Sequence, residues 1–404
     1  MHFGPILSAM RRNKVGAFLI ALQMALTLAI LCNALFIIHQ RVVLMARPSG
    51  VDEANTFSLS NQWVGSPEQI GAMIRGDLAA LRGLPGVVDA YATNAYPLRG
   101  GGWSEGVSLA PNQKHSTAHT ARYFTDDHAL NALGAHLIAG RNFTSDEIGE
   151  RSERDKARPG VIIVTKALGE KLFPDGSALG KTVYVEDQPI VIVGIVDMLK
   201  TPWVSNAWAE KFVENSMLDP YIFIAKQYSY IVRAQPGQVD AVMQTAQKKL
   251  FEVNRNRVIE KVRSYAQIRA DAYRNDRALA IILGTVSTAL LAVTAFGIVG
   301  LTSFWVTQRR RQIGVRRALG ATRRAILAYF QTENGIIASV GALLGMALAV
   351  GLNLWMVKAL EMQRLDLLYV LCGAVAVMML GQFAVLWPAL RAASTPPALA
   401  TRAS

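Results

Sequence analysis

Four long apolar stretches constrain this chain more than any other feature of its 404 residues. A helix needs roughly 20 consecutive apolar residues to cross the hydrocarbon core of a bilayer. Four stretches reach that length without a single charged residue, and they are Val15–Ile38, Ala278–Val306, Gly335–Val357 and Leu367–Leu390. The sequence therefore predicts four transmembrane helices, at residues 15–38, 278–306, 325–357 and 367–390.

The first stretch differs from a cleaved signal peptide. Such a peptide has an apolar core of about 7–15 residues and a small-x-small cleavage site. The apolar run that ends at Ile38 is longer, and the segment Ile37–Arg41 offers no such site. We therefore expect a retained anchor.

Positive charge beside the spans predicts their orientation, because cytoplasmic flanks carry an excess of Lys and Arg. Such residues precede the first span, separate the second from the third and follow the fourth: Arg11, Arg12, Lys14, seven arginines in 307–324, Arg391 and Arg402. We expect both termini and the loop 307–324 to be cytoplasmic, with 39–277 and the short turn 358–366 outside. The net charge of +13 then reflects topology and not a nucleic-acid partner.

The cytoplasmic ends are short. Residues 1–14 are predicted to form an amphipathic helix on the inner leaflet, because apolar residues recur there at helical spacing: Phe3, Ile6, Leu7 and Met10. Residues 391–404 are the expected tail. Both cysteines, Cys32 and Cys372, lie in apolar runs, so no disulfide is expected in the outside segment.

The segment 39–277 predicts an α/β domain of two subdomains. Two strand–helix–strand units, within 47–96 and 226–265, each have a proline expected in the first turn of the helix, and we expect the units to pair into one split α/β subdomain. Between them, 97–225 contains β-branched runs and turn signals typical of a β-rich subdomain. Stalk helices are expected at both ends, with 266–277 continuing as a helix into the second span.

A glycine-rich motif at Gly176–Thr182 resembles a nucleotide-binding P-loop only superficially. It has three residues between its glycines where a P-loop has four, and Gly180-Lys181-Thr182 opens a predicted strand instead of a helix. We therefore expect no nucleotide or other cofactor in this chain.

Candidate catalytic and metal-binding residues lack supporting context. His115 and His119 have the i, i+4 spacing of two ligands on a helix, but no third ligand is evident. The acidic pairs Asp126-Asp127 and Asp146-Glu147 fit helix starts better than a catalytic dyad. Trp203 and Trp208 fit packing better than a ligand surface, although both interpretations remain open. We predict no catalytic residue and no metal.

The basic loop carries the strongest functional signal. It is predicted to continue the second-span helix, to end with Gly320 at the C′ position, and to be followed by Thr322 as the cap of the third. Topology alone requires a few positive charges, not arginines interleaved with apolar residues. We therefore expect a helix that docks a cytoplasmic partner, formed by Arg309, Arg310, Arg311, Gln312, Ile313, Gly314, Val315, Arg316, Arg317, Ala318, Leu319 and Gly320.

The loop Gln308–Arg324 resembles the pattern RxREIGIRxALGAT of FtsX-like, MacB-type ABC transporter permeases, with Gln312 where the pattern has Glu. The resemblance continues along the chain in the order of the family. The further matching segments are Arg11–Lys14, Leu137–Phe143, Val164–Leu168, Leu172–Pro174, Leu179–Lys181, Val193–Asp197 and Ile326–Glu333. In the third span, Gly341 and Gly345 have the small-xxx-small spacing of a close helix contact, so Glu333, Gly341 and Gly345 are expected at an interface of that span.

This resemblance implies a type VII ABC architecture in a bacterial inner membrane. Two permease protomers, identical or homologous, would each carry a MacB-like periplasmic core domain. Two ATPase subunits, holding ATP and Mg²⁺, would dock at the cytoplasmic loops. The chain contains no Walker A or ABC signature sequence, so the ATPase is expected on a separate polypeptide. Members of this family transmit ATP-driven closure through the stalk, a process called mechanotransmission.

Two functions remain open for such a machine. The first is efflux or extraction of a substrate from the periplasm or outer leaflet, with a membrane-fusion adaptor and an outer-membrane channel as further partners. The second is an FtsX-like regulator that activates an extracytoplasmic hydrolase or senses a peptide. The large two-part outside domain favours transport.

Overall fold

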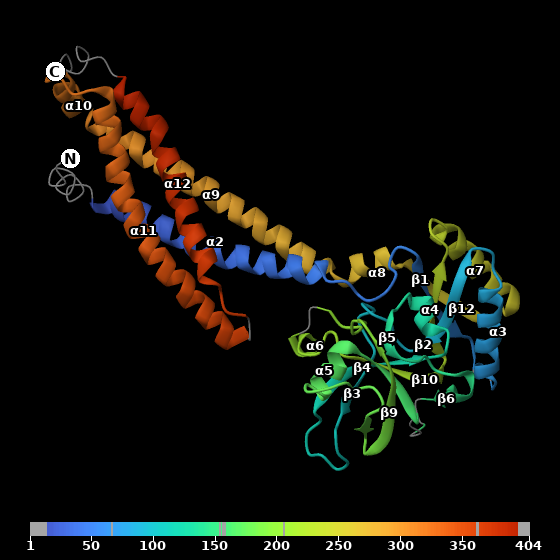
Figure 1. Ribbon diagram of the computed structural model, residues 1–404. Coiled ribbons are helices and arrows are strands. Elements are labelled where there is room, and N and C mark those ends of the chain that lie inside the picture. The colour runs from blue at the N-terminus through green and yellow to red at the C-terminus, as the bar shows by residue number, and fades with distance from the viewer. Residues whose placement is uncertain are drawn as a thin grey trace. The chain divides into compact units, whose positions relative to one another are not determined.

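The computed structural model describes residues 14–65, 68–152, 155, 159–204, 207–360 and 363–394. The chain divides into two compact units (Figure 1). Residues 1–45 and 276–404 form the first, and Ala46–Asn275 form the second. The predicted amphipathic helix at 1–14 lies outside the described residues except for Lys14, as does the tail beyond residue 394.

The first unit is a bundle of helices. Within the described ranges, four of them are long and apolar enough to cross a membrane. A shorter helix joins the second and third of these. The helices are α2 (Lys14–Ala46), α9 (Arg274–Gln308), α10 (Arg310–Ala318), α11 (Arg323–Leu360) and α12 (Leu367–Ala393).

Helices α2 and α9 contact each other along much of their length. The hydroxyls of Thr27 and Thr294 share a buried hydrogen bond of 2.7 Å. Nearer the second unit, Arg41 Nη1 lies 3.0 Å from Asp276 Oδ1, and Asp276 is almost fully buried. With 33 and 35 residues, each helix is about 50 Å long, well beyond the roughly 30 Å of a hydrocarbon core. The excess length carries the pair past any bilayer that the bundle spans.

Glycines allow α11 to approach α2 closely. A Cβ atom at Gly341 would lie 2.8 Å from the Ala21 carbonyl oxygen, and one at Gly345 would lie 2.9 Å from that of Ala25. Real Cβ atoms do not come this close, so only glycine fits at either position. The two glycines therefore meet α2 of the same chain.

The second unit contains a four-stranded antiparallel sheet with the order β12-β1-β11-β2. Helices α3 and α7 cover one face of it, because apolar side chains recur on one side of each helix. The two predicted strand–helix–strand units supply all of its strands. The elements are β1 (Thr56–Trp63), α3 (Ile70–Arg82), β2 (Val87–Thr93), β11 (Gln227–Ala234), α7 (Val239–Val253), β12 (Arg257–Ser264) and α8 (Tyr265–Ala272).

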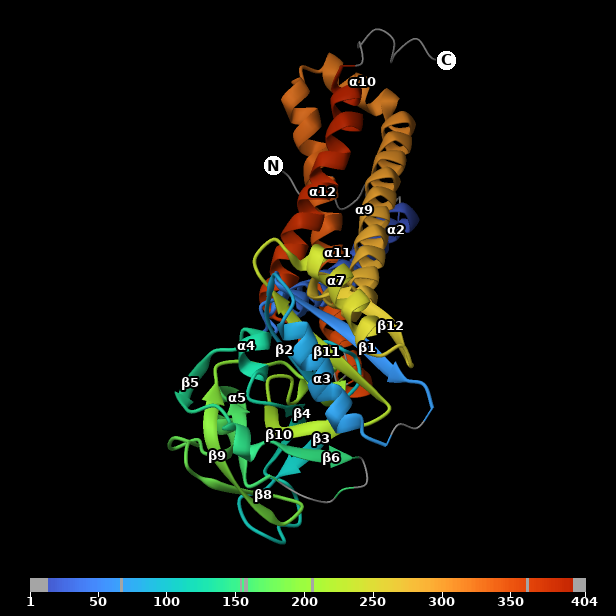
Figure 2. The same ribbon diagram turned by 90° about the vertical axis from the view of Figure 1, so that its right-hand side faces the viewer.

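An eight-stranded mixed sheet is inserted in the sequence between the two strand–helix–strand segments (Figure 2). Its main path is β3-β4-β10-β7-β9-β5, with β6 beside β10 and β8 beside β9. The strands are β3 (Trp103–Val107), β4 (Ala118–Thr125), β5 (Leu137–Gly140), β6 (Gly149–Ser152), β7 (Val161–Thr165), β8 (Thr182–Val185), β9 (Gln188–Val196) and β10 (Ser216–Ile224). The helices are α4 (Ala129–Leu133), the 3₁₀ turn η1 (Ser145–Glu147), α5 (Lys166–Leu172) and α6 (Ala207–Glu210).

Two local expectations were wrong, and the rejected histidine pair is not helical. The helix before the second span is interrupted at Tyr273, where α8 ends and α9 begins, and the buried Tyr273 hydroxyl accepts a hydrogen bond from Lys200. Pro236 does not open α7, which begins three residues later at Val239. His119 lies in strand β4, so His115 and His119 do not share a helical face.

Candidate functional site: the basic helix between the second and third spans

Helix α10 is a separate element at the end of the bundle (Figure 1). The expected continuous helix is broken at Arg309, between the last residue of α9 and the first of α10. At the other end Gly320 has φ +92°, and the amides of Gly320 and Ala321 donate to the carbonyls of Arg317 and Arg316. This is a Schellman motif with glycine at C′.

Thr322 caps the helix that follows. Its Oγ1 accepts a hydrogen bond of 3.2 Å from the Ala325 amide, in the first turn of α11. The turn between α10 and α11 is therefore fixed by local chemistry at both of its ends.

An ion pair anchors the beginning of α10 to α11. Arg309 Nη1 donates to both carboxylate oxygens of Glu333, at 3.0 and 2.8 Å. The Glu333 side chain is 3% exposed and that of Arg309 is 12% exposed. A buried carboxylate needs such a partner, so this pair determines where the chain turns from α9 into α10.

Two more arginines hold the remainder of α10. The guanidinium of Arg316 lies 5.1 Å from the ring centroid of Tyr329 on α11. Arg317 Nη1 donates to the carbonyl of Ala393 at the end of α12, over 2.8 Å. Ile313 and Gly314 are buried between these contacts. The inner face of α10 is thus fixed to two spans.

The outer face of α10 is exposed. Arg310, Arg311 and Gln312 face solvent, and so do Val315 at 47% and Leu319 at 83% exposure. Beside this face, a cavity of about 180 Å³ lies between α10 and the start of α11. An exposed combination of arginines and large apolar side chains on a rigid helix is typical of a docking surface.

Most of the predicted docking residues are therefore brought together on one helix, in two groups. Arg309, Ile313, Gly314, Arg316 and Arg317 contact the neighbouring spans or are buried. The exposed outer face is formed by Arg310, Arg311, Gln312, Val315 and Leu319. The sequence did not predict that Arg309 and Glu333 contact each other, or that Tyr329 takes part. One signal was available: Glu333 is the only acidic residue between Asp276 and Glu361, and a lone acid in a membrane helix requires a cationic partner.

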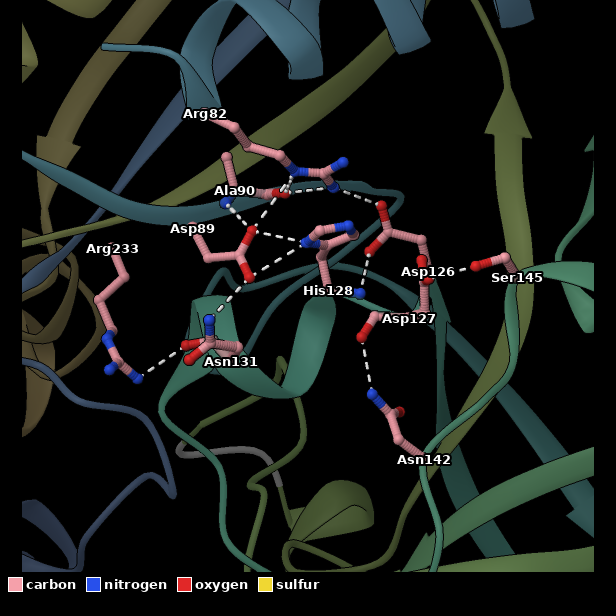
Figure 3. Close-up of polar contacts among 10 residues, drawn as sticks. All are labelled: Arg82, Asp89, Ala90, Asp126, Asp127, His128, Asn131, Asn142, Ser145 and Arg233. Carbon is pink, nitrogen blue, oxygen red and sulfur yellow. Dashed lines mark hydrogen bonds and ion pairs between the residues drawn. The ribbon is translucent and has the colours of Figure 1, made fainter. Parts of the chain in front are cut away.

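A second polar cluster joins the two subdomains of the other unit (Figure 3). Asp89 on β2 receives hydrogen bonds from the Asn131 amide at 2.8 Å and lies 2.9 Å from His128 Nδ1. Arg82 on α3 bonds Asp126 at 2.8 Å. Burial raises the pKa of the Asp126 carboxyl, although the Arg82 charge opposes that rise.

This cluster contains the residue types of a catalytic triad, but its geometry differs. Ser145 Oγ donates to Asp127 Oδ2 at 2.8 Å instead of to His128 (Figure 3). A triad requires the hydroxyl to bond the imidazole that Asp89 orients. The contacts instead connect α3 and β2 of one subdomain with α4 and the segment after β5 of the other, so the cluster fixes the two subdomains to each other.

Comparison with known families gives two matches. A family model for the FtsX-like permease C-terminal region matches residues 284–397. A model for the MacB-like periplasmic core domain matches residues 24–250, more than half of the chain. The first match contains the basic helix, and the second contains most of the two-subdomain unit.

Several relatives are similar to this chain at low sequence identity. The uncharacterized ABC transporter permeases YknZ and YvrN of Bacillus subtilis are 25% and 23% identical over 332 and 316 residues. These alignments cover 81% and 74% of this chain, and 78% and 73% of the relatives. The macrolide export ATP-binding/permease protein MacB of Chromobacterium violaceum is 26% identical over 54% of this chain, which corresponds to 33% of the relative.

Among solved structures, the periplasmic region of MacB from Actinobacillus actinomycetemcomitans matches with a TM-score of 0.36 and 14% identity. The match covers 55% of this chain and 94% of that structure.

Proposed function

Since this chain belongs to the ABC transporter permeases that join a MacB-like periplasmic core domain to an FtsX-like permease region, we propose that it couples ATP hydrolysis by a separate ATPase to movement of its periplasmic domain. That movement would drive efflux or extraction of a substrate from the periplasm or the outer leaflet. The relative named for macrolide export supports this direction of transport.

The observation that carries the proposal is the outer face of α10. Arg310, Arg311, Val315 and Leu319 are exposed while the inner face is fixed by Glu333 and Ala393. A rigid helix with such a face suits reception of force from a docked ATPase. A flexible loop would absorb that force.

The route to the outside is the pair α2 and α9. Both helices run directly into the periplasmic unit, at Ala46 and Asn275, and they contact each other through Thr27, Thr294, Arg41 and Asp276. We propose that closure of two ATPase subunits at α10 moves this pair and hence the domain attached to it.

The proposed assembly has partners of specific kinds. Two ATPase subunits would bind ATP and Mg²⁺, and this chain would be the non-catalytic membrane component. A second permease protomer would complete the dimer. In an efflux system, a membrane-fusion adaptor and an outer-membrane channel would meet the periplasmic domain, in an inner membrane with both termini cytoplasmic.

The test uses the outer face alone. Arg311→Glu combined with Leu319→Asp should reduce co-purification of an ABC ATPase with the detergent-extracted chain at least tenfold, because one substitution reverses a charge and the other places a carboxylate in the apolar contact. The bound ATPase is identified by mass spectrometry and by vanadate-sensitive ATP hydrolysis in the eluate.

Lys358→Glu is the matched control, since this exposed residue lies at the opposite end of α11. It should leave the ATPase yield unchanged. Full co-purification of the ATPase with the α10 double variant would refute docking at α10, and so would the absence of any ATPase from the wild-type eluate after cross-linking.

A further inference from the structure

A hollow of about 660 Å³ lies in the periplasmic unit, where the chain passes between the two subdomains. The chain leaves the four-stranded sheet after β2, enters the eight-stranded sheet at β3, and returns between β10 and β11. Both of these crossover segments line the hollow, the first with Asn94, Arg99, Gly101 and Gly102 and the second with Ala225 and Lys226. Small-molecule sites have volumes of roughly 300–1,000 Å³ and occur preferentially where domains meet.

The charged side chains that line the hollow are both positive. Arg99 comes from the first crossover and Lys226 from the second, and none of the lining residues that the structure describes is acidic. The Lys226 ammonium forms no ion pair or hydrogen bond with any described residue. Arg99 Nη1 donates to the Gly101 carbonyl at 3.3 Å, but the guanidinium has no acidic partner within the described ranges. Two cationic groups on separate segments around one opening suit an anion that contacts both.

Aromatic side chains form another part of the lining. Trp103 at the beginning of β3 and Phe223 near the end of β10 both border the hollow, with ring centroids 5.4 Å apart and an interplanar angle of 80°. The buried Phe124 packs against both rings, with centroid distances of 5.2 Å. This packing holds the two lining rings in place, and fixed aromatic rings contact a further ring favourably. An inorganic anion would use the two cations alone, whereas an anion with an aromatic ring would use both parts of the lining.

We infer that this hollow binds a small organic anion that carries an aromatic ring, with the anionic group at Arg99 and Lys226 and the ring against Trp103 and Phe223. The inference goes beyond the proposed coupling to an ATPase, because every residue of the site lies within Ala46–Asn275. Binding requires no contact with the docking helix.

The bound anion would also link the two crossovers. Arg99 precedes β3, and Lys226 stands between β10 and β11, so a single anionic group held by both side chains joins the segments that connect the subdomains. A ligand that binds only the folded chain stabilises it by mass action. The urea midpoint of the full chain should therefore rise with ligand concentration.

The test uses three sulfonyl compounds and the full chain in a nonionic detergent. Naphthalene-2-sulfonate carries both ring and charge, naphthalene-2-sulfonamide carries the ring without the charge, and methanesulfonate carries the charge without the ring. Isothermal titration calorimetry measures the affinity for each compound, with the titration into detergent alone subtracted. We expect one naphthalene-2-sulfonate per chain, bound at least about tenfold more tightly than either other compound, because it alone combines charge-assisted hydrogen bonds with ring contacts.

Three variants locate the binding in this hollow. Arg99→Gln combined with Lys226→Gln should abolish the preference for the sulfonate over the sulfonamide, while the sulfonamide binds as it does to the wild type, which shows that the fold remains. Arg99→Lys keeps the charge and should keep most of the preference. Arg255→Gln with Lys248→Gln is the matched control, since it removes one exposed arginine and one exposed lysine of the same unit outside the hollow, and it should bind as the wild type does.

Several results would overturn the inference. Equal affinity of the wild type for the sulfonate and the sulfonamide would remove the role of the cations. Equal affinity for naphthalene-2-sulfonate and methanesulfonate would remove the role of the aromatic rings. An unchanged preference in the glutamine variant would place the binding elsewhere on the chain, and no binding of naphthalene-2-sulfonate at millimolar concentration would refute the site. Co-purification of an ATPase is unaffected by any of these outcomes, so the two proposals fail separately.

Discussion

Replacing Lys200 should remove a specific dependence of stability on alkaline pH. Its side chain is fully buried, and Nζ donates to the Arg47 carbonyl at 3.1 Å and to the Tyr273 hydroxyl at 3.3 Å. Burial, together with the positive charges of Arg269 and Arg47, lowers the pKa of this ammonium from 10.5 to about 8. Folding therefore favours the neutral amine.

The direction and size follow from proton linkage. Below pH 8 both the folded and the unfolded chain hold the proton on Lys200, so the full cost of burying the charge is present. As pH rises from 8 to 10.5 the folded chain loses this proton before the unfolded chain does, and the free energy of unfolding increases. A pKa that falls from 10.5 to about 8 corresponds to about 3 kcal/mol at roughly 1.4 kcal/mol per pH unit. About 2 kcal/mol of this free energy of unfolding should be regained as the pH rises from 7 to 9.5.

The assay is urea unfolding of the detergent-solubilised chain at several pH values, followed by tryptophan fluorescence. Four of the seven tryptophans, Trp63, Trp103, Trp203 and Trp208, lie in the periplasmic unit. The quantity of interest is the stability of the wild type minus that of Lys200→Met, because other titrating groups cancel in this difference. Lys248→Met, at an exposed position of α7, serves as the control.

A difference that stays constant from pH 7 to 9.5 would refute the argument for Lys200. A difference that falls with increasing pH would show that the lysine is stabilised as a cation. If the wild type minus Lys248→Met stability difference rose equally with pH, the pH dependence would not come from Lys200.

Two further substitutions test single contacts. Gly345→Leu should destabilise the bundle by about 1–3 kcal/mol, because its Cβ would lie 2.9 Å from the Ala25 carbonyl oxygen and would force α11 away from α2; thermal unfolding in detergent measures this. Asp77→Asn should destabilise the periplasmic unit by about 3–5 kcal/mol, because Arg257 bonds both Asp77 oxygens at 2.7 and 2.8 Å and would keep an uncompensated buried charge; the urea midpoint measures this.

Each of these substitutions has a matched control in the same helix or subdomain. A Cβ at Gly351 meets no atom within 4 Å, so Gly351→Leu should leave the melting temperature nearly unchanged. Asp240 is exposed on α7, and Asp240→Asn should change stability by less than about 0.5 kcal/mol. Equal effects of a test variant and its control would contradict the contact on which the prediction depends.

Much of the periplasmic fold could be predicted from local patterns. The β-branched run Val161–Thr165 forms strand β7, and the apolar run Val87–Thr93 forms strand β2. Such runs are short, apolar and bounded by turn residues, so strands can be predicted from them without tertiary information. The break at Tyr273 had no such signal, since neither glycine nor proline is present there, and a contact with Lys200 from a distant segment accompanies it.

The turn that ends α10 was predictable for the same reason, but the side-chain contacts of α10 with α11 and α12 were not. Gly320 and Thr322 lie within the turn that they define, so their roles could be read from the sequence. Arg309 ends one helix and begins another because it pairs with Glu333, 24 positions along the chain. Periodicity reports the face on which a residue lies, but it does not report which distant side chain it meets.

The first and last strands of the periplasmic unit, β1 and β12, are neighbours in the four-stranded sheet. This position has a mechanical consequence. Strands β1 and β12 are antiparallel neighbours, and Phe57 near the start of β1 pairs with Ser264 at the end of β12. The segment after α2 leads into β1, and β12 leads through α8 to α9, so both connections are at the same end of one strand pair. Forces that pulled them apart would break the hydrogen bonds of that pair one at a time, as in a zipper.

A common pull on both helices would leave the same hydrogen bonds unloaded. The Arg41–Asp276 ion pair stands between the helices just before the chain enters the domain. It would carry a separating force first. The strand pair would therefore resist a common pull on its two attachments and would yield if they were pulled in opposite directions.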